Sequence, residues 1–180
     1  FTGPGHLQIR PNSTNFSSVL SMSDINFTGT SINELYLGRS GTNTKLVLDE
    51  DISTGNEIHI YMPVEVNGGD RSITATNDNI RFYQTINSDT SARTLTLDSG
   101  NGNVRIDGAV GNSAPLNNIN IIAEALTAGA ITLNGALTAT LGGSSSITGV
   151  IANGASTANL VKAGTGTLTL SGANTYTGTT

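Results

Sequence analysis

The sequence LVKAGTGTLTLSGANTYTGT spans residues 160–179 and has the pattern of one short strand between two turns. Leu168 and Leu170 alternate with threonine, and glycine-rich segments flank them on both sides. Alternation with a period of two places both leucines on one face of a strand, whereas glycine, serine and asparagine favour turns. Short alternating segments and turns follow one another along most of the chain, so an all-β fold is predicted.

An internal repeat relates these short strands to one another. The apolar pair that begins at Leu95 returns 24 residues later at Ile119, and the pair at Val104 returns 27 residues later at Ile131. Periods of this length are typical of solenoids, in which each coil stacks on the one before it. We therefore predict a parallel β-helix of about seven coils, with a β-sandwich of short antiparallel strands as the alternative. The side chains expected to point inward are Leu95, Leu97, Val104, Ile106, Ile119, Ile121, Ile131, Leu133, Leu168 and Leu170.

Two stretches also resemble known repeats. Residues 160–179 resemble the autotransporter-associated β-strand repeat of large secreted bacterial proteins. The sequence from Leu95 through Gly111 resembles the repeats of filamentous-haemagglutinin-like secreted proteins, so that the two resemblances together cover residues 94–178. They imply a right-handed parallel β-helix outside the cell, and they imply no chemistry. Residues 31–180 are accordingly expected to form the β-helix, and residues 1–30 an N-terminal arm or cap.

Composition excludes several classes of protein. The net charge of −5 argues against binding to nucleic acid, because little would neutralise phosphates. No run approaches 18 apolar residues, so we expect no membrane insertion. The chain has no cysteine, which excludes disulfides and thiolate metal sites.

The sequence offers few candidates for chemistry. Asp49, Glu50 and Asp51 form the densest carboxylate cluster and are a weak candidate for Ca²⁺, although a solvated corner is the preferred interpretation. His6 and His59 are the two histidines, and no third nitrogen or sulfur ligand accompanies them. We therefore predict no catalytic residue, no cofactor and no obligatory metal.

Four arginines recur at nearly even intervals, at Arg71, Arg81, Arg93 and Arg105. A basic stripe beside carboxylates on one outer face is what a polysaccharide-cleaving β-helix uses, so such an enzyme is an alternative. We favour the interpretation that these arginines form ion pairs on the surface and have no catalytic role.

The preferred functional prediction is a structural extracellular protein, a subunit of a surface fibre or adhesive filament that assembles head to tail. Residues 125–180 carry a single charge, Lys162, so little would repel a partner at that end. The residues predicted to take part in self-assembly are Leu168, Thr169, Leu170, Tyr176, Phe1, Leu7 and Ile9. The alternative is an isolated passenger fragment of a type V secreted adhesin, with a surface or polysaccharide ligand on a lateral face.

Overall fold

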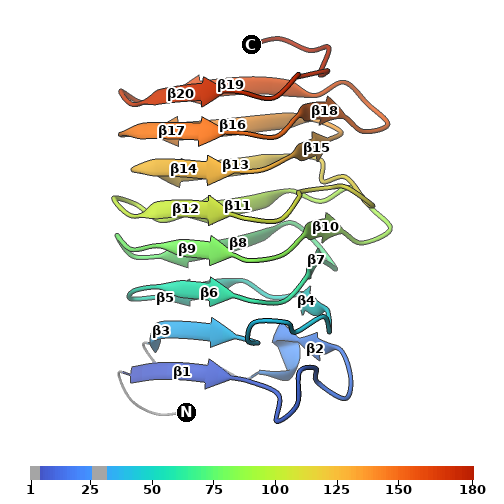
Figure 1. Cartoon of the computed structure of the whole chain (residues 1–180), viewed down its shortest axis with the longest axis vertical. Coiled ribbons are helices and arrows are strands. Elements are labelled where there is room, and N and C mark those ends of the chain that lie inside the picture. Colours follow the sequence, from blue (N-terminus) through green and yellow to red (C-terminus); the bar gives the residue numbers. More distant parts are fainter. Residues whose placement is uncertain (1–4, 26–31) are drawn as a thin grey trace.

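A computed structural model describes residues 5–25 and 32–180, which form a parallel β-solenoid of about seven turns (Figure 1). Every strand pairing in it is parallel, which confirms the predicted fold class and rules out the antiparallel sandwich. In Figure 1 the front strands run to the right and the chain returns behind them as it climbs, so the winding is right-handed.

Three faces of parallel strands enclose the core. An eight-stranded sheet forms the front in Figure 1 and contains, in order, β1 (Gly5–Ile9), β3 (Ile32–Leu37), β6 (Ile58–Ile60), β9 (Ile80–Phe82), β12 (Asn103–Ile106), β14 (Ala125–Ala128), β17 (Ser144–Ile147) and β20 (Thr167–Leu170). A six-stranded sheet behind it contains β5 (Ile52–Thr54), β8 (Arg71–Ala75), β11 (Leu95–Asp98), β13 (Ile119–Ala123), β16 (Ala136–Leu141) and β19 (Asn159–Ala163).

The third face is divided into two parts. Its lower sheet contains β2 (Leu20–Ser21), β4 (Leu46–Leu48), β7 (Val64–Val66) and β10 (Ile86–Ser88), and its upper pair is β15 (Ile131–Leu133) with β18 (Ile151–Asn153). Two isolated bridges of Val110, to Ile86 below and to Ile131 above, connect the two parts. One turn of 3-10 helix, η1 (Met22–Asp24), follows β2.

The core consists of inward residues that stack along the axis. Alternation within each short strand directs every second side chain inward, and branched aliphatic side chains fill the narrow interior. Phe82 is the largest fully buried side chain. Of the ten residues predicted to point inward, eight are buried, whereas Leu168 and Leu170 are half-buried against the core. These two leucines lie in the last strand of the sheet, where no described coil covers them.

The predicted repeat is correct for one sheet and wrong for another. Leu95 pairs with Ile119, as the 24-residue spacing predicted. Val104, however, pairs with Leu126 and not with Ile131, which bridges to Val110 on the third face. Strands of all three faces alternate in the same way, so alternation alone does not identify the face to which a strand belongs.

Polar side chains at the corners join successive coils. Asn134 accepts hydrogen bonds from the backbone N–H groups of Ala155 (2.6 Å) and Ser156 (3.4 Å), one coil later. Asp70 accepts one in the same way from the N–H of Thr94 (2.8 Å). These bonds satisfy backbone donors where the chain turns and the sheet pairing stops.

Candidate functional site

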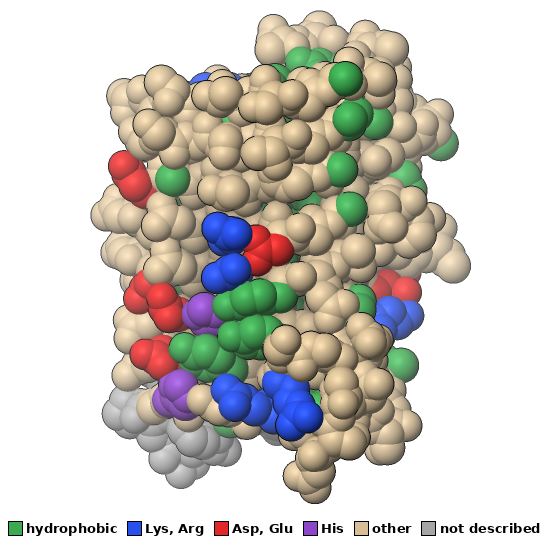
Figure 2. Space-filling view, in the orientation of Figure 1, with side chains coloured by type: hydrophobic (Ala, Val, Ile, Leu, Met, Phe, Trp, Pro, Cys, Tyr) green, Lys and Arg blue, Asp and Glu red, His purple; other side chains and the backbone are tan. Residues whose placement is uncertain are grey.

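The most distinctive surface lies on the outer face of the eight-stranded sheet, in its lower half. Histidine, arginine, acidic and apolar side chains gather there, whereas the upper half of the same face is almost free of charge (Figure 2). A column of aromatic rings runs up this lower half, and we call it the aromatic column; its members are His6, Tyr36, His59, Tyr61 and Tyr83.

Strand register produces the column. Tyr36 of β3 is the partner of His59 in β6, and their rings stack with centroids 4.6 Å apart and planes 4° apart. Tyr61 and Tyr83 follow the ends of β6 and β9, where Ile60 is paired with Phe82. Their rings therefore lie one above the other, with centroids 4.0 Å apart and planes 11° apart. Because these rings stack face to face, they present mainly edges and hydroxyls to solvent.

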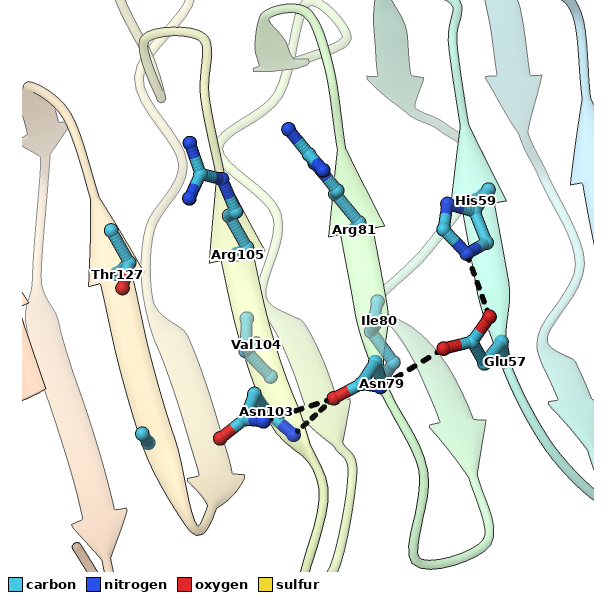
Figure 3. Close-up of a pocket in the computed structure, with 10 residues that line it drawn as sticks. Glu57, His59, Asn79, Ile80, Arg81, Asn103, Val104, Arg105 and Thr127 are labelled. Carbon is cyan, nitrogen blue, oxygen red and sulfur yellow. Dashed lines mark hydrogen bonds and ion pairs between the residues drawn. The ribbon is translucent and has the colours of Figure 1, made fainter.

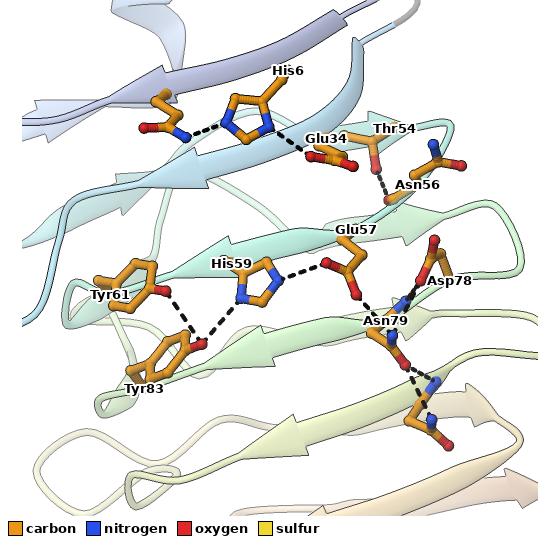
Figure 4. A network of polar contacts seen from close by, with 12 residues as sticks. His6, Glu34, Thr54, Asn56, Glu57, His59, Tyr61, Asp78, Asn79 and Tyr83 are labelled. Carbon is orange, nitrogen blue, oxygen red and sulfur yellow. Dashed lines mark hydrogen bonds and ion pairs between the residues drawn. The ribbon is translucent and has the colours of Figure 1, made fainter.

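Hydrogen bonds connect the column to a carboxylate (Figure 4). The Tyr61 hydroxyl donates to the Tyr83 hydroxyl over 3.3 Å, and His59 lies 3.1 Å from Tyr83 and 3.1 Å from Glu57. Hydrogen bonds from Asn79 and His59 lower the pKa of Glu57, which keeps it an acceptor. His59 Nε2 therefore carries a proton that it donates to Glu57, and in the neutral ring Nδ1 is the acceptor for the Tyr83 proton. Burial, together with the hydrogen bond between the two tyrosine hydroxyls, raises the pKa of Tyr83 to about 12.

Paired charges cap the upper end of the column. The Arg81 guanidinium lies 4.2 Å from the centre of the Tyr83 ring and donates to Asp107 over 2.8 Å. Arg105 donates to the other Asp107 oxygen over 2.6 Å. Burial raises the pKa of Asp107, but the hydrogen bonds from both arginines outweigh it, so this carboxylate stays charged. The Arg105 side chain is 51% exposed and is thus open to a further anion.

A groove of about 370 Å³ opens beside these charges (Figure 3). It exists because Ala125 and Thr127 of β14 are shorter than Asn103 and Arg105 of β12, which are their neighbours in the sheet. The groove is lined by Glu57, His59, Asn79, Ile80, Arg81, Asn103, Val104, Arg105, Ala125 and Thr127. Its size lies in the usual range for a small-ligand pocket.

The four evenly spaced arginines do not form one basic stripe, and three of them take part in ion pairs, as the favoured interpretation expected. Arg81 and Arg105 lie together on the eight-stranded sheet and share Asp107. Arg93 pairs instead with Asp89, over 2.9 Å, and Arg71 lies in β8 on another sheet. Even spacing in the sequence therefore did not place the four arginines on one face.

Two of the three carboxylates in the weak calcium candidate accept hydrogen bonds from protein groups, and the three do not converge on one site. Asp49 accepts from the hydroxyls of Ser21 and Ser23, both over 2.6 Å, and Asp51 accepts from the N–H of Ser72 over 2.8 Å. Within residues 5–25 and 32–180, no group of three or more His, Cys, Asp or Glu side chains is placed to hold a metal ion. Glu50 is exposed.

The residues predicted to mediate self-assembly lie at opposite ends of the solenoid. Leu168, Thr169 and Leu170 belong to β20 at the upper end, where half-buried Tyr176 packs against the core. Leu7 and Ile9 belong to β1 at the lower end. Phe1 lies outside the described residues. In the part of the chain that the structure describes, no helix is sufficiently long and apolar to cross a membrane.

The sequence prediction missed the aromatic column and the groove. A signal was present, because His59 and Tyr61 precede Arg81 and Tyr83 by the same interval of 22 residues. This interval is the local coil length, which became evident only once the coils were aligned in space.

Comparison with known proteins concerns the last coil. Residues 160–180 match the model of the family described as passenger-associated-transport-repeat. None of the curated proteins and none of the solved structures matches the chain. On a parallel β-solenoid this match fits the repeats of autotransporter passenger β-helices, and it implies a secreted or surface protein. The last described coil is thus similar to a repeat of the passenger-associated transport type.

Proposed function

We propose that the protein is a stiff structural segment of a surface passenger, and that copies of it assemble head to tail. The observation that carries this proposal is the upper end of the solenoid, where Leu168 and Leu170 point inward yet remain half-exposed. In a solenoid each coil buries its apolar face against the next one, so an uncovered coil favours the addition of another. Lys162 is the single charge in residues 125–180 and hence offers little repulsion.

The lower end supplies a matching surface. β1 and β20 are the two outer strands of the same eight-stranded sheet, and all pairings in that sheet are parallel. Stacking one copy on another therefore continues the sheet from β20 into β1 without a change of strand direction. Leu7 and Ile9 of β1, half-buried against the core, would cover the leucines of β20. Such a heterologous contact propagates into a filament when its rotation does not close a ring.

Light scattering over a range of protein concentrations tests the assembly. We expect the mean mass to rise with concentration, and filaments to appear by electron microscopy. Leu168→Lys and Thr169→Lys place a charge on the end strand and should leave a folded monomer. Thr127→Lys is the matched control, because Thr127 is also exposed on the outer face of this sheet but lies within the stack.

Two results would contradict the proposal. One is a protein that stays monomeric at high concentration, which would assign the open end to a further coil of the same polypeptide. The other is loss of assembly in the Thr127→Lys control as well, which would indicate association through lateral faces.

The groove on the lateral face supports a second candidate, a binding site for an acidic polysaccharide. The Arg105 side chain is about half exposed, and it lines the groove together with Asn103 and Thr127. A guanidinium recognises carboxylates, and amides and hydroxyls recognise sugar hydroxyls. Titration calorimetry with uronic acid oligosaccharides should show binding that Arg105→Ala abolishes and Thr169→Ala preserves. Appearance of unsaturated products in the same mixture would favour cleavage over binding.

A further inference from the structure

Tyr61 and Tyr83 form a contact that neither structural stacking nor saccharide binding requires. They lie 22 residues apart, in successive coils, with ring centroids 4.0 Å apart and hydroxyls 3.3 Å apart. With the rings parallel and the hydroxyls adjacent, the carbons next to each hydroxyl also face one another (Figure 4). The chain has four tyrosines, and this is the one pair of them that stacks in the described structure.

A proton acceptor is already in contact with this pair. Nδ1 of His59 lies 3.1 Å from the Tyr83 hydroxyl, and Nε2 lies 3.1 Å from Glu57. In the neutral ring that donates from Nε2 to Glu57, Nδ1 is the acceptor for the Tyr83 proton. The Tyr61 hydroxyl donates in turn to the Tyr83 oxygen, so all donors point in one direction along the chain of hydrogen bonds. A phenol loses an electron more readily when its proton can leave at the same time, and this chain of hydrogen bonds provides the path.

We propose that Tyr61 and Tyr83 are an oxidative cross-linking site, at which hydrogen peroxide and a peroxidase join the two rings by a carbon–carbon bond. Each phenol loses one electron and one proton, and the Tyr83 proton passes first to His59. The two radicals couple at the ring carbons adjacent to the hydroxyls, and the two hydrogens on those carbons then leave as protons while the hydroxyls are restored. The pair loses two hydrogen atoms in all, and the peroxide is reduced to two molecules of water.

The cross-link would bind two coils of a chain that has no cysteine and so cannot form a disulfide. It closes a loop of 22 residues. By analogy with a disulfide that closes a loop of this length, it should raise the unfolding temperature by about 5–10 °C. Arg81 lies over the free face of Tyr83 and leaves Tyr61 as the ring with which Tyr83 couples.

Treatment of dilute protein with a peroxidase and hydrogen peroxide tests the proposal. We expect dityrosine fluorescence from a monomeric product, a mass two hydrogen atoms lower, and a cross-linked peptide pair that contains Tyr61 and Tyr83. Tyr61→Phe should lose the product, whereas Tyr36→Phe and Tyr176→Phe should retain it. His59→Gln should slow the cross-linking at least several-fold and weaken its dependence on pH, because the rings stay in place without the proton acceptor.

A second comparison keeps the test independent of whether a variant folds. The unmodified protein, oxidised in urea above its unfolding midpoint, should lose the preference for the 61–83 pair. A product that joins other tyrosines, that forms only between molecules, or that forms equally well in urea would overturn the assignment.

Discussion

Replacing Leu97 or Leu168 by alanine should cost very different amounts of stability, although the two leucines occupy equivalent inward positions. Leu97 in β11 is fully buried between Ile73 of β8 and Ile121 of β13. Leu97→Ala removes three buried carbons, worth about 2.4 kcal/mol in transfer free energy. The cavity left between the two neighbouring coils raises the total to about 3–4 kcal/mol.

Leu168 has a neighbouring coil on one side alone. Its partner in the sheet is Ser145 of β17, and its side chain is half-exposed. Leu168→Ala therefore loses roughly half of the transfer term and leaves no closed cavity, for a total of about 1 kcal/mol.

Urea unfolding followed by circular dichroism at low protein concentration measures the difference. With a slope of about 2 kcal/mol/M, Leu97→Ala should lower the midpoint by about 1.5–2 M and Leu168→Ala by about 0.5 M. Equal costs for both variants at low concentration would contradict an open upper end. If copies stack at higher concentration, the cost of Leu168→Ala should grow with concentration and that of Leu97→Ala should not.

Three further substitutions address the backbone, a surface ion pair and a corner. Gly164 has a φ of +78°, so Gly164→Ala should destabilise the last coil by about 1–3 kcal/mol in urea unfolding. The hydrogen bond from Arg93 holds the pKa of Asp89 at about 2, so this carboxylate stabilises the folded protein above pH ~4, and its contribution disappears as the pH falls through about 2. The urea midpoint should thus fall less steeply between pH 4 and pH 2 in Asp89→Asn than in the unmodified protein. Asn134→Ala should cost about 0.5–1.5 kcal/mol, because it removes the acceptor of the Ala155 N–H.

The glycine substitution needs a matched control. Gly154→Ala does not serve as a control for Gly164→Ala, because a Cβ there would meet Asn134 and Pro115, whereas at Gly129 it would have contacts of ordinary length. Gly129→Ala should therefore be near neutral. Equal pH dependence of the unmodified protein and Asp89→Asn, or a neutral Asn134→Ala, would show that those contacts do not form as described.

The fold was predictable because two patterns carry separate information: alternation within a few residues identifies strands, and the long period identifies coils. Leu95 and Ile119 could be aligned from the sequence, since the coil between them has its full length and both lie on one sheet. Val104 could not, because the corners differ in length and its partner is Leu126, 22 residues later. A period that varies between coils must be measured in space.

The candidate site was harder to predict for a related reason. His59 lies on the outer face of β6, with its ring stacked on Tyr36. Which outward residues meet depends on the register between coils, and single-sequence patterns leave this register open. The column joins residues from four successive coils, and the groove depends on the short side chain of Ala125 one coil above Asn103.

The ladder of parallel strands also bears on the order in which the molecule can fold. Each inner strand of the eight-stranded sheet pairs with the strands one coil before and one coil after it, so the pairings of this sheet join neighbouring coils. Closing one coil costs the entropy of a loop of about two dozen residues and nothing more. Folding can therefore proceed coil by coil, with each new coil pairing with the exposed strands of the coil that folded before it. If such a chain reached the cell surface from one end, only the residues of the coil then being added would have to be unfolded.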